Sequence, residues 1–139
     1  FDVKLAVTRA NDNPSFYVQY AHARCCSIFR EMKDRNIDQL PINQVDLNLL
    51  TVDEEAQIIK KMAGYPGVIL NAAEEREPYR VPNYLYELSS HFHTFYNKFR
   101  VLDMDHPDLT QSRLVLVRCV QIVISNGLKL LGISAPEKM

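Results

Sequence analysis

The stretch NPSFYVQYAHARCCSIFR, residues 13–30, predicts a long helix with two different faces. Asn13 is a favourable N-cap residue, and Pro14 suits the first helical position, because the N–H that proline lacks has no helical partner there. On a helical wheel one stripe is apolar and consists of Val18, Ala21, Cys25, Ile28, Phe29 and Met32. We therefore expect a helix from Pro14 to about Asp34, with this stripe facing a core.

The other face of this predicted helix carries Tyr20, Arg24 and Ser27, and Tyr17 lies between the two faces. Tyr20 and Arg24 are four residues apart, so their side chains lie one above the other. A phenol ring beside a guanidinium group forms a platform on which an unpaired nucleic-acid base can stack. Spacing alone favours a second interpretation, in which a surface tyrosine packs against the aliphatic part of an arginine.

The composition predicts one folded domain. The chain has 139 residues, of which 47% are hydrophobic, and this is enough to form a core. Its net charge of −1 gives no indication of a nucleic-acid partner. The longest apolar run, residues 114–117, is too short to cross a membrane, and the first residues lack the apolar run of a signal peptide. We therefore expect neither a membrane span nor a membrane partner.

The cysteines Cys25, Cys26 and Cys119 do not form an even disulfide framework. Cys25 and Cys119 lie in apolar runs and are interpreted as small core residues. This cysteine usage is typical of a reducing compartment, so we expect a cytoplasmic protein.

Helical signals continue to the end of the chain. Thr51 and Glu54 form a candidate capping box, and Asp108 or Thr110 is a candidate cap for the last helix. The further helices are expected over residues 51–63, 66–73, 82–99 and 109–131. No run shows the alternation of a β-strand. The predicted fold is therefore an all-α antiparallel bundle of about five helices.

The apolar stripes of these helices predict the core. Its expected members are Leu88, Phe92, Phe95, Leu116, Val120, Val123 and Leu131. The connection over residues 42–50 is expected to tuck Leu47, Leu49 and Leu50 under that core.

No pattern in the chain indicates catalysis. His91 and His93 are two residues apart on a predicted helix, about 200° around its axis, so they cannot hold one metal ion together. The aspartates of residues 103–108 lack the glycine and the closing glutamate of a calcium loop. No glycine-rich phosphate loop is present. We predict no catalytic, metal-binding or cofactor-binding residue.

Several segments in order resemble the C-terminal anticodon-binding (DALR-type) domain of arginyl-tRNA synthetases. They include YVQYAHAR (residues 17–24), PNYLYEL (82–88), FYN (95–97), GLKLLGI (127–133) and the terminal PEKM (136–139). Residues 1–12 resemble the end of the catalytic domain that precedes this domain in the family. We therefore expect residues 1–12 to be a remnant of that domain or a linker, and residues 13–139 to form the helical anticodon-binding domain. The family's domain is a helical bundle, which agrees with the fold predicted from the helical patterns.

The resemblance implies that the chain binds the anticodon loop of arginine tRNAs and does not bind DNA. It also implies that the catalytic domain of the same polypeptide is a second partner. The motifs that use ATP and Mg²⁺ lie upstream in this family, so the fragment is expected to need no cofactor and not to aminoacylate. The implied anticodon-binding residues are Tyr20, Arg24 and Met139, with Tyr17 and Ser27 beside them. Met139 can join this group only if the C-terminal tail folds back onto the first helix.

Two alternatives remain open. The chain could be a related anticodon-binding bundle of another synthetase, or a helical protein-interaction domain that does not bind RNA. Titration with cognate and non-cognate tRNA distinguishes the three possibilities.

Overall fold

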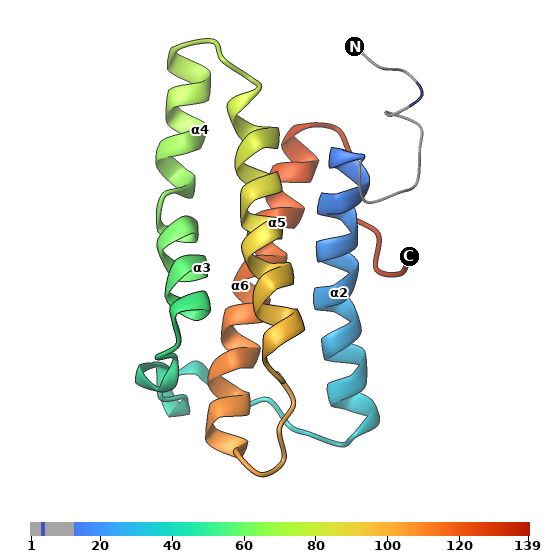
Figure 1. Cartoon of the computed structure of the whole chain (residues 1–139), viewed down its shortest axis with the longest axis vertical. Helices are drawn as coiled ribbons and strands as arrows, with labels where there is room; N and C mark the ends of the chain where they lie inside the picture. The colour runs from blue at the N-terminus through green and yellow to red at the C-terminus, as the bar shows by residue number, and fades with distance from the viewer. Residues whose placement is uncertain (1–3, 5–12) are drawn as a thin grey trace.

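The computed structural model describes Lys4 and residues 13–139, and this part of the chain is helical without any strand (Figure 1). The predicted all-α class is therefore confirmed. The α-helices are α2 (Pro14–Asp34), α3 (Asp53–Ala63), α4 (Tyr65–Glu74), α5 (Arg80–Lys98) and α6 (Pro107–Leu130). Two short 3-10 helices, Ile42–Gln44 and Leu47–Leu49, lie between α2 and α3. The expectation for residues 1–12 concerns positions that, except for Lys4, lie outside the described residues.

The helices form an antiparallel bundle in which α5 is central. In Figure 1, α3 and α4 follow each other along one side of the bundle, α2 forms the other side, and α6 lies behind α5. The helix α5 contacts α2, α3, α4 and α6. The last residues of the chain return along α2, so the C-terminus lies beside that helix (Figure 1).

The core follows the apolar stripes of the helices. Leu85, Leu88, Phe92 and Phe95 of α5 are all fully buried, and α6 contributes Leu114, Val117, Val120 and Ile124. The predicted core positions are confirmed except for Val123 and Leu131, which are only partly buried.

Three apolar predictions are wrong. Leu47 and Leu49 are exposed, because the short 3-10 helix that carries them lies at the end of the bundle and not beneath it. Cys119 is exposed as well, because it points away from the neighbouring helices, whereas Cys25 is fully buried as expected.

Local capping explains where the helices begin. Asn13 caps α2 as predicted, and its side-chain Oδ1 accepts hydrogen bonds from the backbone N–H of Ser15 (3.0 Å) and Phe16 (3.4 Å). Neither predicted cap of α6 is used. That helix begins at Pro107, and the hydroxyl of Thr110 is instead hydrogen-bonded to the backbone N–H and carbonyl of Asp103.

The start of α3 is one residue later than the capping box around Thr51 predicted. The N-cap is Val52, whose backbone N–H donates to Glu55 Oε1 over 3.1 Å. Glu55 is fully buried, and its Oε2 accepts a 2.8 Å hydrogen bond from Arg113 Nε on α6. Because this tertiary ion pair fixes Glu55, it also fixes where α3 begins.

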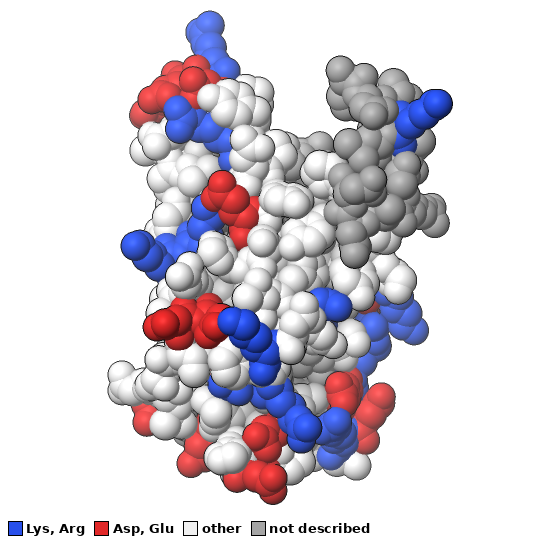
Figure 2. Space-filling model, in the orientation of Figure 1, with Lys and Arg blue, Asp and Glu red and all other residues white. Residues whose placement is uncertain are grey.

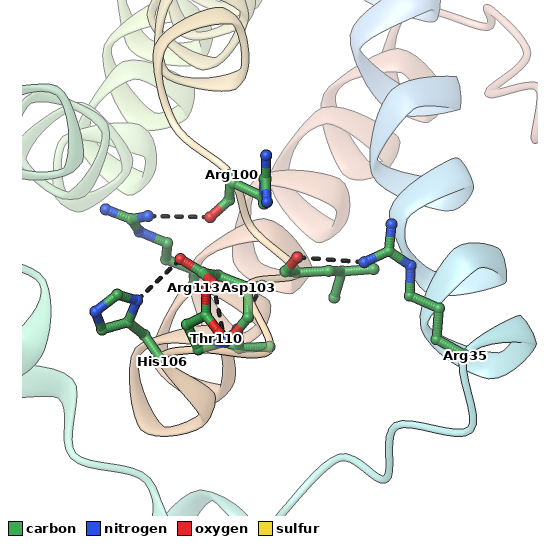
Figure 3. A network of polar contacts seen from close by, with 8 residues as sticks. Arg35, Arg100, Asp103, His106, Thr110 and Arg113 are labelled. Atoms are coloured by element: carbon green, nitrogen blue, oxygen red, sulfur yellow. Dashed lines mark hydrogen bonds and ion pairs between the residues drawn. The ribbon is translucent and has the colours of Figure 1, made fainter.

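Arg113 connects the bundle to the α5–α6 loop. Its second nitrogen, Nη1, donates to the backbone carbonyl of Arg100 over 3.0 Å (Figure 3), and its guanidinium lies over the rings of Phe95 and Phe99. Three elements, namely α3, α6 and the loop after α5, therefore meet at one buried charge pair.

The contact between α5 and α6 at Gly127 can be tested by substitution. A Cβ at this position would lie 2.6 Å from the side chain of Leu85, which is fully buried. We expect Gly127→Ala to lower the free energy of unfolding by about 1–3 kcal/mol through overpacking. The measurement is urea unfolding followed by circular dichroism.

Gly67→Ala in α4 is the matched control, because no atom lies within 4 Å of a Cβ there. It should raise stability by up to about 1 kcal/mol through helix propensity. Equal stabilisation by both substitutions would mean that α5 and α6 are not as closely packed at Gly127 as described.

Candidate nucleic-acid interface

The C-terminal tail is held along α2 by side chains of that helix. Gln19 Nε2 donates to the carbonyl of Ser134 (2.9 Å), His22 Nδ1 to that of Pro136 (2.9 Å), and Arg30 Nη1 to that of Glu137 (2.9 Å). The tail turns at Gly132, whose φ of 70° is readily accessible to glycine. The expected return of the tail to the first helix is confirmed, and it brings Met139 close to Tyr20 and Arg24.

Arg24 is held between two tyrosine rings. Its guanidinium carbon lies 4.7 Å from the ring centre of Tyr20, on the same helix, and 4.3 Å from that of Tyr96 on α5. Its Nη1 lies 2.9 Å from Nδ1 of His93. Because a guanidinium group stays protonated, Arg24 donates this hydrogen bond and His93 accepts it through a neutral ring.

The surroundings of His93 keep it neutral. The side chain is buried, its ring stacks against Tyr20 with 5.6 Å between the ring centres, and the ring of Tyr17 lies 4.8 Å away. Burial and the neighbouring charge of Arg24 lower the pKa of His93 to about 4, although the backbone carbonyl of Tyr17 acts in the opposite direction.

Side chains of α2, α5 and the tail enclose a cavity of about 360 Å³, which we call the α2–tail cavity. It is lined by Tyr20, Ala23, Arg24, Ser27, Arg30, Tyr96, Lys138 and Met139. Of the residues predicted for the site, Tyr20, Arg24, Ser27 and Met139 therefore meet there. Tyr17 does not line this cavity, because its ring packs against Tyr86 and His93.

Sequence reasoning missed Arg30, Tyr96 and Lys138. Tyr96 lies on α5, and only the packing of α5 against α2 brings it to this cavity. Lys138 could have been inferred from its place next to Met139. Arg30 lies beyond the predicted platform on α2, and it reaches the cavity because the tail passes over it.

A larger cavity of about 690 Å³ lies next to the first, between α2 and the α5–α6 loop, and we call it the loop cavity. Ser27 and Tyr96 line both cavities. The loop cavity also has cationic side chains, those of Arg35, Lys98 and Arg100.

The wider surface carries mixed charge. In Figure 2, much of the described part of the visible face is uncharged, and basic side chains form a short band across its lower half with acidic side chains on both sides. This agrees with the net charge of −1. A polyanion would therefore have to be bound by a few placed cations and aromatic rings, not by a basic surface.

No helix in the described part of the chain is long and apolar enough to cross a membrane. Within the same residues, no group of three or more histidine, cysteine or acidic side chains is placed to hold a metal ion.

A model of the DALR anticodon binding domain matches residues 18–139. The chain belongs to this family. The all-α bundle described above is therefore the fold of this DALR domain.

Similar proteins agree with the assignment to the DALR family. The chain is 48% identical to the arginine–tRNA ligase of Syntrophotalea carbinolica and 45% identical to that of Symbiobacterium thermophilum, over all of this chain and 25% of each relative. Among solved structures, the Thermus thermophilus arginyl-tRNA synthetase superposes with a TM-score of 0.79 at 30% identity, over all of this chain and 23% of that one. A putative arginyl-tRNA synthetase from Campylobacter jejuni gives 0.80 at 26% identity, over all of this chain and 29% of that one. The chain spans about a quarter of the length of the relatives that it matches.

The lowered pKa of His93 predicts a pH dependence of stability. Between pH 6.5 and about 4, the unfolded chain binds a proton at His93 that the folded chain does not. Stability should therefore fall as the pH is lowered through this window, by at most about 1.4 kcal/mol per pH unit from this group. Urea unfolding at several pH values measures the slope.

His93→Gln is the comparison variant, because glutamine does not titrate and its Oε1 can still accept a hydrogen bond from Arg24. The variant should show a shallower slope between pH 6.5 and 4. Identical slopes for the two proteins would show that His93 is protonated equally in the folded and unfolded states.

Proposed function

We propose that this chain is the anticodon-binding module of an arginine–tRNA ligase and that its α2–tail cavity takes an unstacked base of the arginine anticodon loop. The observation that carries the proposal is the meeting of Tyr20, Arg24, Tyr96 and Met139 around one cavity. The names of the relatives support arginine tRNA as the partner, because each of the relatives is an arginine–tRNA ligase.

The cavity suits the middle base of the anticodon. Arginine codons have guanine at their second position, so arginine anticodons have cytosine there. Recognition of an unstacked cytosine needs a surface for stacking and donors for the base's O2 and N3 acceptors. Tyr20 and Tyr96 provide aromatic surface, and Arg24 uses only Nη1 toward His93, which leaves its other N–H groups to donate to the base.

Met139 closes the cavity from the tail side. Its side chain is 52% exposed, so a base could displace it without disrupting the core. A thioether is flexible and polarizable, and it packs well against aromatic rings. We propose that Met139 covers the bound base.

Aminoacylation would belong to the rest of the parent enzyme. In this proposal ATP and Mg²⁺ are used by a catalytic domain of the same polypeptide, in the cytoplasm, and the present chain contributes only tRNA binding. The bundle would fix the anticodon end of the tRNA, so that the acceptor end is presented to the catalytic domain.

The proposal predicts selective binding of an anticodon stem-loop. The chain should bind an arginine anticodon stem-loop more tightly than the same RNA with the middle cytosine replaced by uracil. Tyr20→Ala should weaken binding of the cytosine RNA by about 1–3 kcal/mol through lost stacking. Fluorescence anisotropy with labelled RNA measures both effects.

Tyr79→Ala is the matched control, because Tyr79 is an exposed tyrosine that does not line the α2–tail cavity. If the chain binds neither RNA, the protein-interaction alternative replaces the proposal. If it prefers another tRNA's stem-loop, it is the module of a different synthetase.

Deletion of Lys138 and Met139 tests the role of the tail. The backbone hydrogen bonds of Ser134, Pro136 and Glu137 to α2 remain in this variant, so the midpoint of thermal unfolding should change little. Affinity for the cytosine stem-loop should fall, and discrimination against uracil should decrease. Unchanged affinity for both RNAs would exclude Met139 from the site.

A further inference from the structure

The loop cavity continues the α2–tail cavity along the bundle. Ser27 on α2 and Tyr96 on α5 line both, so the two cavities are directly adjacent. A ligand that occupied only the α2–tail cavity would leave the larger cavity beside it unused. A chain of linked units, such as single-stranded RNA, can occupy both.

The loop that borders the second cavity is held from two sides. Arg113 of α6 donates to the carbonyl of Arg100, and Arg35 of α2 donates to the carbonyl of Leu102 over 3.4 Å (Figure 3). At the far end of the loop, Asp103 is bonded to His106 and Thr110 (Figure 3). A binding site on this loop is therefore formed before a ligand arrives, which lowers the entropic cost of binding.

Arg100 differs from the other cations of the loop cavity. Lys98 pairs with Glu54 at 2.8 Å, and Arg35 pairs with Glu31. The guanidinium of Arg100 forms no hydrogen bond or ion pair within the described residues, and Figure 3 shows only its backbone carbonyl engaged. The hydrogen bond from His106 is the main cause of the lowered pKa of Asp103, and the charge of Arg100 is a minor one.

An unpaired guanidinium group beside an aromatic wall is suited to one nucleotide. The planar donor fork matches a phosphate, and the rings of Tyr96 and Phe99 offer apolar surface to a base. Glu31 also lines this cavity, but its carboxylate is neutralised by Arg35. The uncompensated charge at the cavity is thus positive.

We propose that the loop cavity binds the nucleotide next to the base held in the α2–tail cavity, with a backbone phosphate on Arg100 and the base against Tyr96 and Phe99. This rests on the proposed function, since it extends the same RNA path by one nucleotide. At this site Arg100 contacts the RNA backbone and not a base edge. The contact therefore adds affinity and fixes the position of the RNA, whereas the α2–tail cavity provides the specificity for a base.

Arg100→Gln tests the proposal, because it removes the charge from an exposed side chain and keeps the backbone carbonyl that Arg113 uses. Affinity for the arginine anticodon stem-loop should fall about fivefold or more, and the slope of log affinity against log salt should decrease by about one. The preference for cytosine over uracil should be retained. Arg76→Gln, between α4 and α5 at the opposite end of the bundle, removes the same charge and should change affinity by less than about twofold.

Neutral methylphosphonate linkages placed one at a time in the RNA loop identify the contact. One position should weaken binding to the wild-type chain and have no further effect on Arg100→Gln. If Arg100→Gln matches Arg76→Gln, while Tyr20→Ala still weakens binding, the second nucleotide site is wrong and the proposed function stands. If the wild-type chain binds no anticodon stem-loop, both proposals fail.

Discussion

The buried pair of Arg113 and Glu55 is the interaction on which most of this architecture depends. A carboxylate without any exposed surface would cost several kcal/mol if it had no partner, so its position in the fold is closely constrained. Glu55 satisfies one oxygen with Arg113 and the other with the backbone of Val52, and this sets the start of α3. The same guanidinium group then holds the carbonyl of Arg100. A stability element in the core therefore also shapes the loop that borders the larger cavity.

Arg24 has a similar role at the α2–tail cavity, with a neutral partner in place of a carboxylate. Its hydrogen bond to His93 and its contacts with Tyr20 and Tyr96 fix the guanidinium plane without neutralising its charge. A carboxylate partner would have cancelled the charge that an RNA ligand needs. The buried, neutral histidine is thus compatible with both a rigid and a cationic site, provided that it stays unprotonated at the working pH.

Structural features that depend on neighbouring residues were predicted correctly from the sequence, whereas features that depend on tertiary contacts were not. The start of α2 was predicted correctly because Asn13 and the following proline act within one turn. The cap of α3 was not, because Glu55 is oriented by a residue 58 positions away, and so Val52 replaces Thr51 as the cap. Likewise, the helical wheel placed Tyr17 between the two faces and the family resemblance placed it beside the site, whereas its ring packs against Tyr86 and His93 of α5. The prediction that Met139 lies near Tyr20 and Arg24 came from the family resemblance, because no rule of local structure specifies where a chain terminus packs.

The charge balance suggests how such a domain can bind RNA while carrying a net charge of −1. Its 16 lysines and arginines are balanced by 17 acidic residues, and several of the basic side chains are engaged in ion pairs, so non-specific attraction to RNA is weak. Weak non-specific attraction favours discrimination, because a larger fraction of the binding free energy then comes from the shaped cavities.

Within the proposed enzyme, the domain would not need high affinity by itself. There, a catalytic domain on the same polypeptide would hold the other end of the tRNA, which would raise the effective concentration of the anticodon loop at this bundle. Modest affinity at each end would also allow the charged tRNA to leave the proposed enzyme, so a preformed site with few cations would suit repeated turnover better than a strongly basic surface.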